Sequence, residues 1–127
     1  MKDGVWWAVV PAAGLGSRFG SNVPKQYHTV LGVTLLDYVL RALLQFHLVE
    51  RVVVALNEND VFWKNSHYVA DPRVQTVIGG RTRHQSVLNA VKSLRSHAEA
   101  DDWVCVHDAA RPGLTLDLIQ RLHDGLS

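Results

Sequence analysis

The sequence predicts an α/β fold with one mostly parallel sheet. Four apolar segments of strand length lack the alternation of a half-exposed strand, and three of them, at Val5–Val10, Arg51–Leu56 and Trp103–His107, are expected to be buried. Apolar residues recur at helical spacing between these segments. Alternation of strands with helices favours a parallel sheet with right-handed crossovers. The predicted strands are Val5–Val10, Arg51–Leu56, Val74–Ile78 and Trp103–His107.

Helices are predicted from periodicity and from capping residues. Thr34 can cap a helix that begins at Leu35, and a second helix is expected from Arg83 to Arg95. Thr115 can cap a third helix near the end of the chain. The positions expected to face inward are Leu36, Val39, Leu40, Leu43 and Leu44 in the first helix, Val87, Leu88, Val91 and Leu94 in the second, and Leu118, Ile119 and Leu122 in the third.

The composition is that of an ordinary globular domain of 127 residues, or of a piece of one. The net charge of +1 creates no global field that would favour nucleic acid or a membrane surface. The longest apolar run, Val5 to Ala13, is about half as long as a membrane-spanning helix. Cys105 is the only cysteine, which excludes a disulfide framework and fits a reducing, cytoplasmic compartment. The tryptophans are interpreted as core or packing residues: Trp6, Trp7, Trp63 and Trp103.

A glycine-rich stretch, Pro11-Ala-Ala-Gly-Leu-Gly-Ser-Arg18, follows the first predicted strand and runs on to Pro24-Lys25-Gln26. Glycines let backbone N–H groups approach an anion, and the two alanines leave room for a flat base or sugar. Arg18 and Lys25 add one forked and one compact cation. The stretch therefore predicts a phosphate-binding loop, whose residues are Pro11, Ala12, Ala13, Gly14, Leu15 and Gly16.

Two better-known glycine motifs do not fit this stretch. A P-loop requires Lys and then Ser or Thr directly after its last glycine, and neither Gly16 nor Gly20 is followed by them. The dinucleotide fingerprint requires a glycine where Phe19 stands and an acidic residue at a later strand end, whereas Asp37 falls within a helical pattern. A glycine-rich turn without a ligand is the alternative, and the two cations count against it.

Two further segments follow predicted strand ends. The first, Gly79-Gly80-Arg-Thr-Arg83-His-Gln-Ser86, leads into a helix, and its glycines allow backbone groups to contact the edge of a base. An ordinary turn with a helix cap is the alternative. Ligands of parallel sheets bind at the carboxyl ends of the strands. We therefore expect this segment, the glycine-rich stretch and Asp108–Pro112 to converge on one edge.

Asp108 ends the last predicted strand, within Val106-His-Asp-Ala-Ala-Arg-Pro112. An exposed carboxylate in this place suits Mg²⁺, which binds few carboxylates together with phosphate oxygens. The alternative is that Asp108 pairs with Arg111 or caps a turn. His107 is interpreted as structural because strand alternation points it away from Asp108.

Taken in order, these motifs resemble the 2-C-methyl-D-erythritol 4-phosphate cytidylyltransferase family of the non-mevalonate isoprenoid pathway. The glycine-rich stretch alone would indicate only the wider sugar-phosphate nucleotidyltransferases. The resemblance implies a Rossmann-like, three-layer nucleotidyltransferase fold, with residues 1–127 as the nucleotide-binding, N-terminal part of a single domain. It also implies CTP and methylerythritol phosphate as substrates, Mg²⁺ or another divalent cation as cofactor, and release of pyrophosphate.

The resemblance assigns catalysis to Arg18 and Lys25, which match two basic residues that stabilise charge on the α-phosphate. The attacking phosphate of the acceptor is largely dianionic at neutral pH, so it needs no general base. Positive charge and positioning are what such a reaction requires. The remaining matches are Gly79, Gly80, Arg83 and Ser86 for the nucleotide, and Asp108 and Arg111 for the metal and methylerythritol phosphate. A side-chain contact from Arg81 to cytosine stays open, because relatives can carry an acidic residue there.

The family's chain continues for about as long again. The resemblance assigns to that part a dimerising β-arm, further substrate contacts, and another Lys and Asp of the active site. A homodimer is therefore expected of the full-length chain. Three functions stay open at this point: the methylerythritol phosphate enzyme, a relative that acts on ribitol 5-phosphate or another polyol phosphate, and a CTP-binding module without turnover by itself.

Overall fold

The computed structural model describes residues 5–14, 23–98, 102–109, 121 and 124. Leu15, Gly16, Arg18 and Arg111 lie outside them, as does nearly all of the helix predicted after Thr115. In chain order the elements are β1 (Trp6–Ala12), the 3₁₀ turn η1 (Lys25–Tyr27), β2 (Thr29–Val30), β3 (Val33–Thr34), α1 (Leu35–Gln45), β4 (Val49–Leu56), the 3₁₀ turn η2 (Trp63–Asn65), β5 (Val74–Ile78), α2 (Arg83–Ser93) and β6 (Trp103–Val106).

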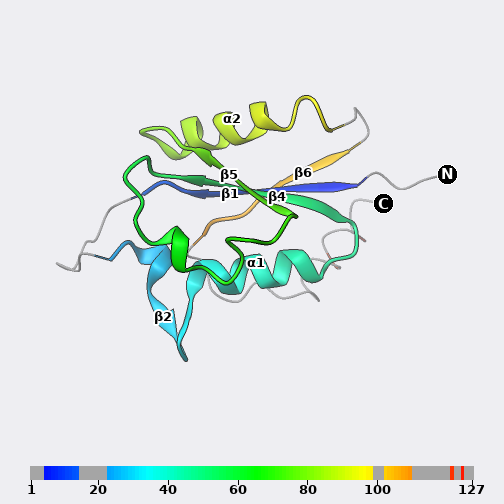
Figure 1. Cartoon of the computed structure of the whole chain (residues 1–127). Coiled ribbons are helices and arrows are strands. Elements are labelled where there is room, and N and C mark those ends of the chain that lie inside the picture. Colours follow the sequence, from blue (N-terminus) through cyan, green and yellow to red (C-terminus); the bar gives the residue numbers. More distant parts are fainter. Residues whose placement is uncertain (1–4, 15–22, 99–101, 110–120, 122–123, 125–127) are drawn as a thin grey trace.

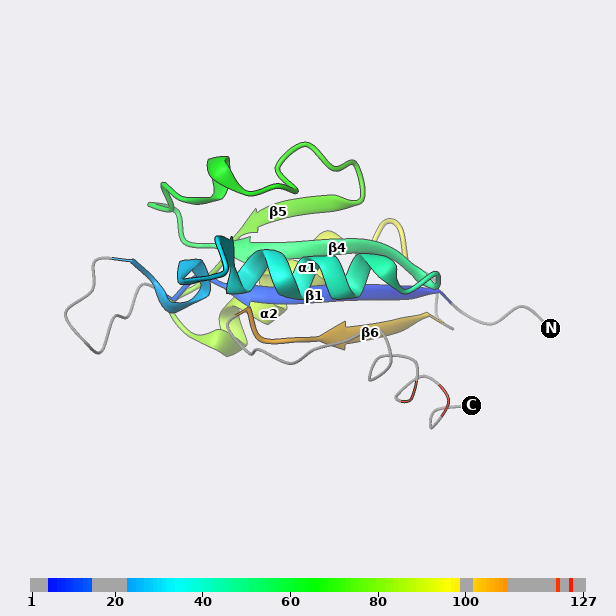
Figure 2. The same ribbon diagram turned by 90° about the horizontal axis from the view of Figure 1, so that it is seen from below.

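Four strands form one parallel sheet in the order β5-β4-β1-β6, which confirms the predicted sheet (Figure 2). β1 lies in the middle, where Val9 pairs with Val53 on one side and with Val106 on the other. Helices α1 and α2 cover opposite faces of the sheet (Figure 1). The described residues thus form the three layers of an α/β fold, with the carboxyl ends of all four strands at one edge.

Both faces of the central strands are buried, which is why their sequences do not alternate. Trp6, Ala8 and Val10 of β1 pack on the α1 side, where the ring of Trp6 meets Phe46 edge to face at 5.4 Å between centroids. Trp7 and Val9 pack on the α2 side. β1 continues to Ala12, two residues beyond its predicted end, so the first two residues of the predicted phosphate loop belong to the strand.

Helix α2 faces the sheet with a set of residues that overlaps only partly with the predicted one: Leu94 is buried and Val91 packs against the core, as predicted. Ser86 and Ala90 are buried, and Leu94 is buried directly after the helix, so the inward line has a spacing of four residues. Leu88 is 39% exposed, and its assignment to the core was wrong. It lies about 200° around the helix from Ser86, because each residue turns the chain by about 100°. Small residues on the inward line let α2 approach the sheet closely.

Strand β6 is more exposed than a buried central strand. Trp103, Val104 and Val106 are 45%, 43% and 37% exposed, so the prediction of a buried strand was wrong, and of the two roles considered for Trp103, core or packing, the core role is excluded. β6 pairs with β1 and stands at the end of the strand order. Apolar composition alone does not distinguish an edge strand from a central one.

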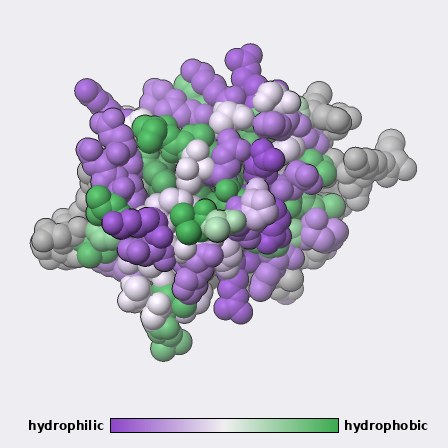
Figure 3. Space-filling view, in the orientation of Figure 1, coloured by the Kyte–Doolittle hydropathy of each residue, from purple (hydrophilic) through white to green (hydrophobic). Residues whose placement is uncertain are grey.

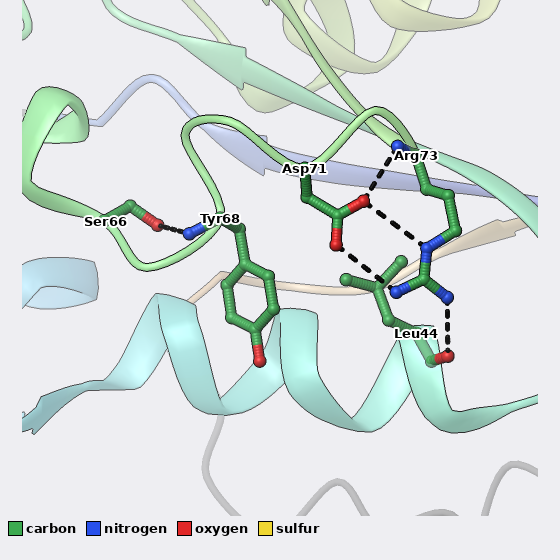
Figure 4. Close-up of polar contacts among 5 residues, drawn as sticks. All are labelled: Leu44, Ser66, Tyr68, Asp71 and Arg73. Carbon is green, nitrogen blue, oxygen red and sulfur yellow. Dashed lines mark hydrogen bonds and ion pairs between the residues drawn. The ribbon is translucent and has the colours of Figure 1, made fainter.

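The segment between β4 and β5 forms hydrogen bonds with α1 at both ends of the helix. At the start, Thr34 caps α1 as predicted, and the buried carboxylate of Asp37 accepts hydrogen bonds from Ser66 Oγ and from the backbone of His67. At the end, Arg73 Nη1 donates to the carbonyl of Leu44 at 3.2 Å (Figure 4).

Asp71 holds Arg73 in this position. Its Oδ2 lies 3.3 Å from Arg73 Nη2, and its Oδ1 accepts from the backbone N–H of Arg73 at 2.8 Å (Figure 4). The hydrogen bonds from the side chain and backbone of Arg73 lower the pKa of the Asp71 carboxyl. The pair thus supplies a cation to the carbonyl end of α1, where the helix dipole favours one.

The β2–β3 hairpin leaves the body of the molecule as a narrow projection with a hydrophobic tip (Figure 3). Its turn is formed by Leu31 and Gly32, both with positive φ, and the side chain of Leu31 is 95% exposed. Neither α-helix among the described residues combines the length and the apolar character needed to cross a bilayer.

Candidate functional site

Segments that follow three of the strands surround one cavity of about 340 Å³ at the carboxyl edge of the sheet. They are the end of β1 with Ala13 and Gly14, the turn between β5 and α2, and the residues after β6. The turn η1 closes a further side. The cavity therefore lies where the sequence placed the site, and the predicted residues that line it are Pro11, Ala12, Ala13, Gly14, Lys25, Gly80, Arg83, Ser86 and Asp108, together with Arg81.

The backbone after β1 is held by side chains from two other segments. Gln26 Nε2 donates to the carbonyls of Ala12 and Gly14, at 2.9 and 3.1 Å, and Asn57 Nδ2 donates to the carbonyl of Ala13 at 3.2 Å. Three successive carbonyls thus have fixed partners. A cradle for an anion needs such a fixed backbone, because its N–H groups can be aimed only if the peptide planes do not rotate.

Lys25 opens the turn η1 and lines the cavity. Tyr27, the last residue of the turn, holds it in place. Its hydroxyl donates to Asp60 Oδ2 at 2.6 Å, and its ring centroid lies 5.0 Å from that of Phe62. Burial, and then the hydrogen bond to Asp60, raise the pKa of Tyr27, which therefore stays protonated and donates this bond at neutral pH. These contacts fix the backbone of Lys25 and leave its side chain to reach into the cavity.

Gly79 is required by close packing. A Cβ at this position would lie 2.7 Å from the Cβ of Ala13 and 2.7 Å from Ser86 Oγ. Gly79 N also donates to the carbonyl of Leu56 at 2.7 Å. The lack of a side chain at Gly79 therefore lets the residues after β1 pack closely against α2, and Gly79 is not among the described residues that line the cavity.

The hydroxyl of Ser86 stabilises the backbone of the turn between β5 and α2. Ser86 is buried, and its Oγ accepts from Gly80 N at 3.0 Å. Thr82 caps α2 by accepting from the backbone N–H of Gln85 at 3.0 Å. The alternative of a turn with a helix cap is therefore correct for the local structure, while Gly80, Thr82 and Ser86 also line the cavity.

Arg83 and Asp108 form an ion pair across the cavity. Arg83 Nε lies 2.9 Å from Asp108 Oδ1, and the two side chains are 60% and 39% exposed. The pair joins the start of α2 to the end of β6. Exposed pairs of this kind contribute only about 0–1 kcal/mol, so a charged ligand can replace either partner at low cost. Sequence reasoning considered Arg111 as the partner of Asp108, and the described partner is Arg83.

Among the described residues that line this cavity, Asp108 is the one with a carboxylate. Within the described residues, three or more His, Cys, Asp or Glu side chains do not gather at any point. A single carboxylate fits Mg²⁺, which completes its coordination with water and phosphate oxygens. Cys105 lies half buried in β6, and burial raises the pKa of its thiol, so the sulfur stays protonated and has the character of a packing residue rather than of a nucleophile.

No role of Gln26, which stands beside Lys25, was predicted from the sequence. Gln26 and Asn57 are the side chains that hold the loop after β1. The signal available in the sequence was weak: a polar residue within a short segment between a proline and an aromatic residue. Only the fold shows that its amide faces two carbonyls.

Comparison with known proteins gives a consistent result. The profile of the IspD family, described as 2-C-methyl-D-erythritol 4-phosphate cytidylyltransferase, matches residues 6–126. A protein of that name from a Pseudomonas putida strain is 45% identical over 118 residues, which are 92% of this chain and 50% of the relative. One from Mannheimia succiniciproducens is 44% identical over 91% of this chain and 49% of its own length. The chain thus spans about half the length of the curated relatives it matches.

Solved structures show the same correspondence. The crystal structure of a 4-diphosphocytidyl-2C-methyl-D-erythritol synthase is 30% identical and superposes with a TM-score of 0.80, covering 98% of this chain and 55% of the other. A 2-C-methyl-D-erythritol 4-phosphate cytidylyltransferase from Francisella tularensis is 36% identical with a TM-score of 0.75, covering 95% and 51%. The four-stranded parallel sheet corresponds to the N-terminal part of these structures.

Proposed function

Because the chain belongs to the 2-C-methyl-D-erythritol 4-phosphate cytidylyltransferase family, we propose that it forms the nucleotide-binding part of such an enzyme. The reaction transfers a cytidylyl group from CTP to 2-C-methyl-D-erythritol 4-phosphate, giving 4-diphosphocytidyl-2-C-methyl-D-erythritol and pyrophosphate. The observation that carries this proposal is the convergence of Gly14, Lys25, Gly80 and Asp108 on one cavity at the carboxyl edge of a parallel sheet.

In this proposal the cavity binds the triphosphate beside the loop after β1. The amine of Lys25 contacts the α-phosphate and stabilises the charge that develops there, together with Arg18. The turn between β5 and α2 contacts the cytidine. Arg83, at the start of α2, lies on the side of the cytidine that carries the phosphates. The acceptor phosphate attacks as an anion, so these residues serve to position and to neutralise charge rather than to remove a proton.

Asp108 is the proposed protein ligand of a Mg²⁺ ion. A bound Mg²⁺ would supply positive charge to the triphosphate oxygens. The carboxylate is held by Arg83 at 2.9 Å, so binding of a cation would release the guanidinium for contact with phosphate or with the acceptor. Arg111 is proposed to contribute to the acceptor pocket. Dimerisation of the full-length enzyme and a cytoplasmic location are further parts of this proposal.

The proposed function is tested first by nucleotide binding to the 127-residue chain. Calorimetric titration with CTP and Mg²⁺ is expected to show weak binding, and ATP and GTP are expected to bind less tightly. Equal affinity for all three nucleotides would contradict a cytidine site. The variant Lys64→Ala serves as the control for substitutions of Lys25. Its CTP affinity should equal that of the wild-type chain, because Lys64 lies on η2 and does not line the cavity.

The second test separates binding from turnover. Pyrophosphate release is followed with CTP, Mg²⁺ and either methylerythritol phosphate or ribitol 5-phosphate. We expect this chain alone to give no appreciable product, because positioning of the acceptor can lower such a barrier by several kcal/mol and the chain spans about half of its relatives. Turnover at the rate of a full-length relative would show that the essential chemistry lies entirely within these residues. A preference for ribitol 5-phosphate would replace the proposed acceptor.

A further inference from the structure

Gln26 is a polar side chain in a buried position beside the proposed catalytic lysine. Its relative exposure is 7%, and its amide nitrogen donates to the carbonyl oxygens of Ala12 and Gly14 at 2.9 and 3.1 Å. Both partners are acceptors, so the side-chain group that faces them has to be the NH₂ end of the amide. One nitrogen atom with two protons satisfies both carbonyls at once.

These two hydrogen bonds join two separate parts of the cavity. Ala12 and Gly14 belong to the end of β1 and its loop, whereas Gln26 lies in η1, directly after Lys25. The other side of η1 is anchored by Tyr27 through its bond to Asp60. Gln26 is thus the contact that joins the turn carrying the lysine directly to the loop that would bind phosphate.

We propose that Gln26 is a positioning residue that sets the place of Lys25 against the loop after β1. The inference rests on the proposed function, in which the amine of Lys25 contacts the triphosphate. A lysine side chain is long and flexible, so the place of its amine depends on where its backbone is held. Small displacements of a charged group in such a site reduce rates and affinities strongly.

Two substitutions remove the hydrogen bonds in different ways. Gln26→Met keeps a similar length and leaves the two carbonyls without this donor. Gln26→Glu keeps the shape and places a carboxylate against two carbonyl oxygens, so it is expected to have the larger effect. Gln45→Met is the matched control, because Gln45 is exposed at the end of α1.

The first experiment measures hydrogen exchange and does not depend on any nucleotide. In the wild-type chain, the side-chain amide protons of Gln26 are expected to exchange more slowly than those of Gln45. In the Gln26→Met variant, the backbone amides of residues 12–14 and 25–28 are expected to exchange about tenfold faster, with no change in Gln45→Met. Equal exchange of the two side-chain amides in the wild type would overturn the proposal even if the variants fail to fold.

The second experiment is a double-mutant cycle on CTP affinity in the 127-residue chain, with Gln26→Met, Lys25→Met and the double variant. Each single change is expected to weaken CTP binding by about tenfold, with little effect on cytidine, which lacks phosphates. The double variant is expected to bind no more than about twofold more weakly than the weaker single variant. Additive losses, or equal losses for CTP and cytidine, would show that Gln26 acts on the general fold and not through Lys25. If the wild-type chain binds no CTP, the proposed function fails, and hydrogen exchange alone decides the role of Gln26.

Discussion

Among the described residues, the buried polar side chains act on the backbone of other segments. Gln26 holds the loop after β1, Asp37 holds the segment at His67, and Ser86 holds Gly80. Each gives a hydrogen-bond partner to backbone groups elsewhere in the chain, and a bond of this kind contributes about 0.5–1.5 kcal/mol. At the scale of single residues, the cavity is therefore shaped by side chains that need not contact a ligand themselves.

A substitution of Lys25 tests the chemistry of the cavity. In a full-length enzyme made by joining this chain to the second half of the Pseudomonas putida relative, Lys25→Ala is expected to lower kcat about a hundredfold, or by about 3 kcal/mol. The KM for CTP should rise by no more than about tenfold, the loss expected for ground-state binding, because the charge is stabilised mainly in the transition state. Arg18→Ala is expected to behave in the same way. Steady-state kinetics checks this, and an unchanged kcat with a raised KM would show that these cations only bind the ground state.

Gly79→Ala tests the close packing between the residues after β1 and helix α2. The added methyl group would lie 2.7 Å from both Ala13 Cβ and Ser86 Oγ, and such overpacking costs about 1–3 kcal/mol. Urea unfolding measures this loss. Gly14→Ala is the control, because a Cβ at Gly14 would meet no atom within 4 Å. Equal stability of the two variants would show that the packing around Gly79 relaxes without strain.

At the scale of elements, α1 depends on contacts at both of its ends. Asp37 joins its first turn to the segment before β5, and Arg73 contacts the carbonyl of Leu44 near its last turn. These contacts place α1 and the segment between β4 and β5 in one unit. Because Asn57 directly follows β4, this unit also fixes the position of Asn57, whose side chain donates to the carbonyl of Ala13.

The cap formed by Asp71 and Arg73 predicts a small dependence of stability on pH. The pKa of Asp71 is lowered in the folded state by Arg73, so its contribution is present above the unfolded pKa and is lost as the pH falls through the folded pKa. Asp71→Asn is therefore expected to lower stability at neutral pH by less than about 1 kcal/mol, since the pair is exposed. Urea midpoints measured from neutral pH to about pH 3 should converge between wild type and variant. A constant difference across this range would contradict the assignment.

At the scale of the whole molecule, β6 presents apolar side chains at the end of the strand order. Trp103, Val104 and Val106 are all more than one-third exposed, and exposed edge strands of this composition favour association. We expect the 127-residue chain to self-associate as its concentration rises. Val104→Lys should reduce this association, as measured by sedimentation velocity, whereas the control Val61→Lys at an exposed position outside the sheet should not. A chain that stays monomeric at high concentration would contradict this prediction.

The sequence by itself determined the parallel sheet, the order of strands and helices along the chain, and the segments that meet at the cavity. These features depend on local patterns: runs of apolar residues, helical spacing, capping residues such as Thr34, and glycines after strands. The rule that the carboxyl ends of parallel strands share an edge then brought Gly14, Gly80 and Asp108 together before any contact was known.

Only the tertiary structure decided which side chains pair across that edge and which strand is exposed. Arg83 meets Asp108 although 24 residues separate them, and Gln26 reaches carbonyls more than ten positions earlier in the chain. The exposure of β6 and of Leu88 likewise follows from what packs against them, not from their own composition. The physical reason is that periodicity records one segment's preference for burial, whereas a pairing depends on the relative placement of two segments, which the packing of the whole fold determines.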